Sequence, residues 1–319
     1  MRLSAFLRLS LSALCGLAVA GCVASPQAPR TAPKAPARPA PAAVVVPQTP
    51  SSAASEAVRL HFARVQADLL SNGLLRTDGG GRDTPFTDRM LAENFIRIAL
   101  YDEYVRGAGG PIQRQTASRL RRWETPVRVG LRFGASVSPQ SRATDTARVR
   151  SYLARLSRLT GHPIALNDSA PNFMIYIVNE DERRALGPVV NAALPGLSQA
   201  ELAGITNMPL STYCLVYAMS EGSTGRYSRA FAVIRSEHPD LLRLSCMHEE
   251  IAQGLGLAND SPRARPSIFN DDEEFALLTT QDELMLRMLY NPALRTGMTE
   301  AEARPIIESL ARALVGGES

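Results

Sequence analysis

The stretch that decides the fold is Cys246-Met-His-Glu-Glu-Ile-Ala-Gln-Gly-Leu-Gly-Leu-Ala-Asn-Asp260. Its apolar positions predict the end of a long helix, from about Pro239 to Leu255, which stops where a glycine allows the chain to turn. Glu249 and Gln253 are four residues apart and therefore share one helix face. Asn259 follows the turn, which we expect to bring it back toward these two side chains.

The stretch resembles the metal-binding helix of zinc peptidases. Read from His248, it matches a His-Glu-x-x-His motif without its second histidine. A second alignment superposes the Gly-Leu that closes such helices in the metzincin group. Glu249, Gln253 and Asn259 then replace the three histidine ligands, and Glu250 replaces the general base.

The replaced side chains change the chemistry that this resemblance implies. Zinc in proteins is bound by imidazole, thiolate or carboxylate, and amide oxygens are poor ligands for it. We therefore expect no zinc and no other cofactor, although carboxylate and amide oxygens could hold a hard divalent cation weakly. His248 and Asp260 complete the candidate site. Three interpretations stay open: a hydrogen-bond network, a polar binding cleft, or an altered catalytic site with Glu250 as base.

The period of the apolar residues predicts the other elements. Four strands are expected, at Val127–Phe133, Phe173–Val178, Tyr213–Met219 and Ala230–Ile234. Further helices are expected around Val58–Leu69, Leu91–Ile98, Pro111–Arg122, Val149–Leu159, Glu283–Tyr290 and Thr299–Leu314, with a short one after Ser198. This order predicts an α+β (α/β-like) domain whose mixed sheet resembles that of a zincin, with a long motif-bearing helix, a helical N-terminal piece and a helical C-terminal tail.

The first residues of the chain predict export and a lipid anchor. An apolar run, Leu9–Ala20, is too short to span a bilayer comfortably and is followed by Gly21 and Cys22. This resembles the processing site of bacterial lipoproteins, which implies a signal peptide at 1–21 and lipid on Cys22. The alternative is an ordinary secretory signal cut at Ala20. With Val next to the cysteine, the resemblance implies the outer membrane, with the protein facing the periplasm.

Residues 22–54 predict a tether. Residues 23–50 contain eight prolines, eight alanines, three basic residues and no acid, a composition that cannot bury enough apolar surface to fold. Residues 55–315 predict a single globular domain, with a helical part at 55–123 and a zincin-like part at 124–315. Five basic residues precede the first acid, so without them the formal charge of +4 becomes −1. This argues against a nucleic-acid partner.

Cysteine usage predicts one disulfide. Cys15 leaves with the signal peptide and Cys22 takes the lipid, which leaves Cys214 and Cys246 in an oxidising compartment. An even pair there predicts a disulfide rather than two free thiols. The acidic run Asp271–Glu274 lacks the alternating ligands and the glycine of an EF-hand, and predicts a solvated turn before a helix.

Several further stretches resemble one bacterial family. Ser267–Asp272, Phe275–Thr279 and Leu289–Pro292, together with the motif above, resemble the family catalogued as domain of unknown function 2927 over about residues 55–315. The family implies no activity, and many members look like lipoproteins. We expect a non-catalytic envelope lipoprotein whose degenerate zincin-like cleft binds a peptide, a glycan or an envelope protein. The alternatives are a metallopeptidase-like hydrolase that uses Glu250 with an unusual metal or none, and a structural spacer in the periplasm.

Overall fold

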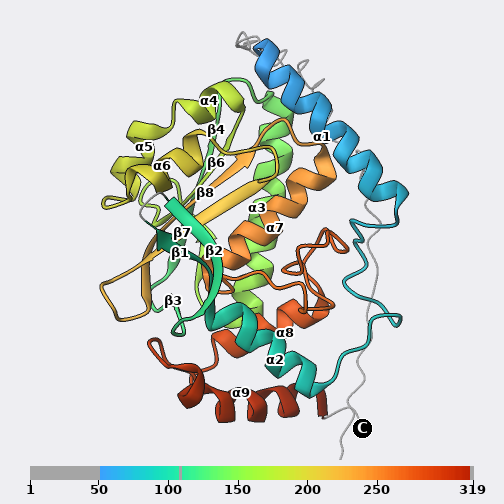
Figure 1. Cartoon of the computed structure of the whole chain (residues 1–319), viewed down its shortest axis with the longest axis vertical. Helices are drawn as coiled ribbons and strands as arrows, with labels where there is room; N and C mark the ends of the chain where they lie inside the picture. Colours follow the sequence, from blue (N-terminus) through green and yellow to red (C-terminus); the bar gives the residue numbers. More distant parts are fainter. Residues whose placement is uncertain (1–50, 108–109, 317–319) are drawn as a thin grey trace, which may run out of the picture. The chain divides into compact units, whose positions relative to one another are not determined.

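A six-stranded mixed sheet organises the part of the chain that the structure, a computed structural model, describes: residues 51–107 and 110–316 (Figure 1). Its strands are β3 (Arg122–Trp123), β4 (Val127–Phe133), β5 (Ile164–Leu166), β6 (Phe173–Val178), β7 (Cys214–Ser220) and β8 (Arg226–Arg235). They are ordered β3-β8-β6-β4-β5, and β7 pairs with β8. Among these pairings only that of β7 with β8 is antiparallel.

Helices cover both faces of the sheet. The helices of this part of the chain are α1 (Ala53–Ser71), α2 (Asp88–Ala99), α3 (Pro139–Thr160), α4 (Glu180–Arg184), α5 (Gly187–Ala193), α6 (Gln199–Thr206), α7 (Asp240–Leu255), α8 (Thr280–Leu289) and α9 (Glu300–Val315). Successive side chains of a strand point to opposite faces. Ile175 of β6 and Ala232 of β8 accordingly belong to a core shared with α3 and α7, whereas Phe231 and Val233 pack against residues of α5 and α6.

The predicted mixed α/β architecture is confirmed, including the helical pieces at both ends. All four predicted strands are present within a few residues of the expected ends. Hydrogen bonds within a few residues set where two of the predicted helices begin: Thr87 accepts from the Met90 N–H group, and Ser198 forms a capping box with Glu201. Gly161 adopts the left-handed conformation that ends α3.

One predicted helix is wrong. The chain over Pro111–Arg122 is not helical but contributes to a β-hairpin of β1 (Tyr101–Gly107) and β2 (Gly110–Ala117), and then to β3. The two hairpin strands pair antiparallel, with Tyr101 opposite Ala117. Cross-strand pairing therefore overrides the weak local preference on which the helix prediction rested. The predicted helical part at 55–123 thus contains strands as well as helices.

The predicted disulfide is confirmed. Cys214, at the start of β7, is bonded to Cys246 in the middle of α7, with 5.9 Å between the two Cα atoms. The bond fixes the edge strand beside the motif helix.

The predictions for the N-terminal segment concern residues that the structure does not describe. The predicted signal peptide, Cys22 and the tether up to residue 50 lie outside the described residues, and α1 already begins at Ala53. None of the helices in the described part combines the length and hydrophobicity needed to cross a bilayer.

Candidate functional site

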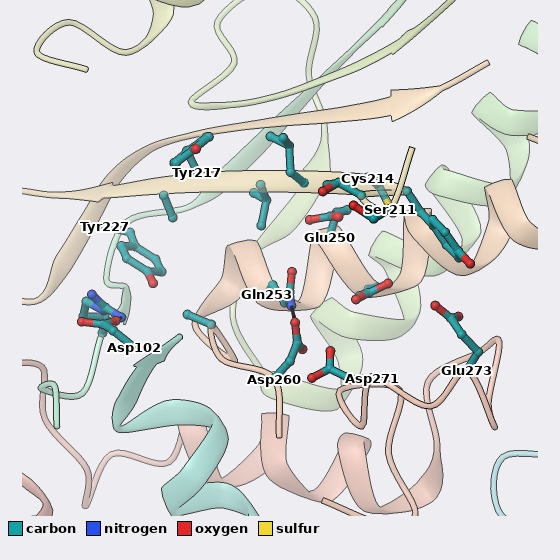
Figure 2. A pocket seen from close by; sticks show the side chains of 18 residues that line it. Asp102, Ser211, Cys214, Tyr217, Tyr227, Glu250, Gln253, Asp260, Asp271 and Glu273 are labelled. Carbon is teal, nitrogen blue, oxygen red and sulfur yellow. Dashed lines mark hydrogen bonds and ion pairs between the residues drawn. The ribbon is translucent and has the colours of Figure 1, made fainter. Parts of the chain in front are cut away.

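A cavity of about 410 Å³ is lined by the edge strand β7 on one side and by the motif helix α7 on the other (Figure 2). The strand wall continues into the preceding loop at Ser211–Tyr213. The α7 wall consists of Glu249, Glu250 and Gln253, and the loops after α7 add Asp260, Asp271 and Glu273. The cavity is therefore built where the sequence motif lies, but from several separate segments.

Strand β7 leaves one edge unpaired. All seven of its residues are partly exposed, and within the described residues β8 is its one pairing partner. An edge strand presents a row of backbone N–H and C=O groups that a further strand can use. In β7 this row lies on the side away from β8.

Helix α7 reaches its position by close packing on the sheet. Its apolar residues, among them Met247 and Ile251, are buried in the main core, so its acidic residues are left for the cavity side. Gly254 is required for this contact because a Cβ atom there would lie 2.4 Å from Cζ of Phe173 on β6. The Trp123 indole N–H also donates to the Gly254 carbonyl oxygen at 2.8 Å.

The structure brings Glu249, Glu250, Gln253 and Asp260 to the cavity. Nε2 of Gln253 donates to both carboxylate oxygens of Asp260, at 3.0 Å each, as the dashed lines in Figure 2 show. The spacing argument expected Asn259 beside Glu249 and Gln253; the structure places Asp260 there instead.

Asn259 and His248 point away from the cavity. Nδ2 of Asn259 donates to the Arg97 carbonyl oxygen at 2.7 Å, and its backbone N–H donates to the carbonyl of Ile98, so both groups bind the end of α2. The His248 ring stacks on Tyr152 with 3.9 Å between ring centroids. Burial lowers the pKa of His248 to about 3, so this histidine is a neutral core residue.

Several cavity residues were not predicted from the sequence, among them two acids in the loop that follows α7. Asp271 and Glu273 belong to the acidic run predicted to be a solvated turn, but both line the cavity. Their φ angles are 62° and 57°, a left-handed conformation that costs a non-glycine residue roughly 1–2 kcal/mol. Glu274 points elsewhere and pairs with Arg76 and Arg265. The run of consecutive acids at Asp271–Glu274 is the sequence feature that could have indicated these two residues, because a solvated turn does not need so many acids.

The cavity is strongly acidic. Six carboxylates line it: Asp102, Glu249, Glu250, Asp260, Asp271 and Glu273. The basic side chain in its lining is Arg121, which already forms an ion pair with Asp102. Five further carboxylates thus lie close together around one cavity.

Burial and the neighbouring carboxylates raise the pKa values of several acids in the cavity. Burial raises the pKa of Glu249 well above its ordinary value, and the charges of Asp260 and Glu250 add to this effect. Burial, then the charges of Asp271 and Asp272, raise the pKa of Glu273 to about 7. The pKa of Asp271 is raised as well, first by burial. A positively charged group in the cavity would therefore be bound in exchange for protons.

No three His, Cys, Asp or Glu side chains in the described part of the chain are arranged as a metal-binding group. Three classes of partner, by contrast, fit a space of this size and polarity: a side chain, a short peptide segment or a sugar unit.

Comparison with known proteins identifies the family of the chain. No curated protein and no solved structure was found to be similar to it. The family model described as "Protein of unknown function (DUF2927)" matches residues 88–309. The match runs from α2 into α9 and includes every residue that lines the cavity. The chain therefore belongs to the DUF2927 family.

Proposed function

We propose that the chain is a non-catalytic binding domain that takes an extended segment of a partner protein along β7, in the cleft of a degenerate zincin-like fold. The observation that carries the proposal is the open edge of β7 beside the acidic cavity. An extended segment added to such an edge gains backbone hydrogen bonds, while alternate side chains enter the adjoining cavity. A peptide fits this geometry better than a glycan, because a glycan has no backbone that matches a strand edge.

The zincin-like interpretation is supported by the arrangement of elements. The motif helix α7 lies beside the single antiparallel strand of the sheet, and the cavity lies between them. At the positions that resemble metal ligands stand Glu249, Gln253 and Asp260, in place of three imidazoles. Location in an oxidising cell envelope is supported by the disulfide, because such bonds are rare in the cytosol.

A hydrolase is the second candidate, and one observation favours it. Glu250 is buried on the cavity wall, where a general base would have to lie (Figure 2). Against it, the Gln253–Asp260 hydrogen bond occupies two of the three positions that would have to activate a water molecule. If the purified chain cleaves a mixture of fluorogenic peptides and Glu250→Gln abolishes the cleavage, the non-catalytic proposal is wrong.

The binding proposal is tested with a library of random decapeptides displayed on phage and selected against the purified chain. Enriched peptides are then synthesised, and their affinities are measured by fluorescence anisotropy. Ala218 of β7 lines the groove, so Ala218→Arg should weaken binding at least tenfold by filling it. The control is Ala154→Arg, at an exposed position on α3. If the selection enriches no peptide, or if both variants bind as the wild type does, the proposal is contradicted.

The envelope location has its own test at Cys22. If the chain is a lipoprotein, Cys22→Ser should leave unprocessed precursor and abolish labelling by a palmitate analogue in cells. Unchanged labelling would mean that Cys22 is not the lipidated residue.

A further inference from the structure

We infer that the partner segment inserts a basic side chain, preferably arginine, into the acidic cavity and passes uncharged side chains over the remainder of β7. This inference rests on the proposed function and specifies the chemistry of the partner. It follows from the charge on the two halves of the groove beside β7.

The acidic half lies at the Cys214 end of the strand. Figure 2 shows Glu250, Asp271 and Glu273 at this end, together with Cys214, whereas Tyr217 lies toward the other end. The carboxylates come from α7 and from the loop at 271–273, so they surround the space rather than lying in one row. Carboxylates would therefore contact a positively charged group of the partner from more than one side.

Arginine fits this space better than lysine. Its planar guanidinium carries five N–H donors and can bind carboxylates on two sides at once, whereas an ammonium acts as a point charge. Two aromatic side chains also line the cavity, Tyr213 and Tyr227, whereas the side chain of Tyr217 packs toward α6 on the other face of the sheet. A guanidinium stacks favourably on such rings. The volume of about 410 Å³ is large enough for a whole side chain.

The groove continues beyond the acidic half. A second cavity, of about 690 Å³, shares Ala218 and Arg121 with the first and extends past Ser220 to Ser223. Its strand side consists of Ala218, Met219 and Ser220, none of which is charged. Arg121 is paired with Asp102, so its charge is already balanced.

The acid at the far side of this second cavity is also paired. Glu300 lies 2.6 Å from Arg304 and accepts a hydrogen bond from the Tyr101 hydroxyl group. Arg119 donates to the Gly297 carbonyl oxygen. This half of the groove therefore lacks the cluster of acids that marks the first half, and it suits uncharged side chains.

The length of β7 defines the reach of the segment. Seven residues at about 3.4 Å each span about 20 Å between the first and last Cα atoms. One arginine over the acidic half, followed by four to six uncharged residues, would cover the strand. Because side chains alternate, moving the arginine by one position would turn it away from the cavity.

The experiment uses the tightest peptide from the selected library. Replacing its arginine by citrulline, which keeps the shape and removes the charge, should weaken binding at least tenfold, since charge-assisted hydrogen bonds are lost. Lysine at the same position should bind with intermediate affinity. Shifting the arginine by one residue should weaken binding about as much as citrulline does.

Protein variants give the second arm. Asp271→Asn and Glu273→Gln lie on a partly exposed loop and keep side chains of similar shape, so the fold should tolerate them. Each should weaken the arginine peptide severalfold and leave the citrulline peptide unchanged. Asp68→Asn, which removes an exposed acid from α1, is the matched control and should change neither affinity.

The outcomes separate the two proposals. If selected peptides bind along β7 but show no excess of arginine or lysine, or if citrulline is tolerated, the charge inference is wrong and the binding proposal stands. If Asp68→Asn weakens the arginine peptide as much as Glu273→Gln does, the attraction is a diffuse surface effect and the inference is again wrong. If no peptide binds, the proposed function itself fails.

Discussion

Removing the disulfide between Cys214 and Cys246 should both destabilise the fold and loosen the candidate site. The bond joins β7 to α7, which form the two walls of the cavity, across 32 residues of sequence. The perturbation is the double substitution Cys214→Ala with Cys246→Ala, which also avoids an unpaired thiol.

The magnitude follows from the length of the closed loop. In the chain-entropy description, a cross-link over about 32 residues reduces the entropy of the unfolded chain by about 12 cal/mol/K, or about 3.7 kcal/mol at 25 °C. For a folded region of this size, that loss corresponds to a fall in Tm of about 7–15 °C. Cys246 is buried, so the packing lost with its sulfur adds to the effect.

The assay is urea unfolding of the oxidised wild type and of the double variant, followed by circular dichroism. Reducing agent should destabilise the wild type by a similar amount and leave the variant unchanged, which separates the cross-link from the substitutions. Affinity for the selected arginine peptide should also fall in the variant, because β7 is no longer fixed beside the acidic residues. A loss of less than about 1 kcal/mol would refute the view that this bond holds the two walls together.

Two further predictions concern the cavity itself. Glu249→His, Gln253→His and Asp260→His together should create a zinc site, detectable by calorimetry. A matched variant with the third histidine at Asn259 and with Asp260→Ala, which removes the carboxylate, should bind zinc much more weakly; equal zinc binding by both would contradict the geometry. The pKa of Glu273 is raised from an ordinary 4.5 to about 7, so its contribution to stability is present below pH 4.5 and is lost as the pH rises through about 7. The free energy of unfolding should therefore fall between pH 5 and pH 8, with a smaller fall in Glu273→Gln; an identical slope in the variant would show that other groups cause it.

The sequence predicted the elements whose ends are decided locally. Thr87 and Ser198 cap their helices, and Gly161 ends α3, because hydrogen bonds and backbone conformation within a few residues determine these positions. The buried strand Phe173–Val178 has the predicted bounds because a short, continuous apolar run suits a strand covered on both faces. The hairpin of β1 and β2 was missed because it depends on pairing between the two strands, which the local preference of each segment does not reveal.

The candidate site was predictable in part for the same reason. Glu249 and Gln253 share a helix face, and the helical period alone establishes this. The third residue of the site depended on the path of the chain after Gly256. Backbone and side-chain hydrogen bonds join Asn259 to the end of α2, and Asp260 lies at the cavity instead. Those bonds are tertiary contacts that spacing cannot reveal. The role of Glu273 likewise depends on how its loop folds back onto α7.

The measurement that tests the central claim most directly is hydrogen exchange of the β7 amides, followed by NMR, with and without the selected arginine peptide. Alternate amides of an edge strand point away from its neighbour and exchange readily unless another strand covers them. The account predicts that the peptide slows exchange at alternate amides within Cys214–Ser220, and that citrulline in place of arginine reduces this protection at equal peptide concentration. Unchanged exchange in β7, with protection at another surface of the molecule, would contradict the claim that this strand is the docking edge.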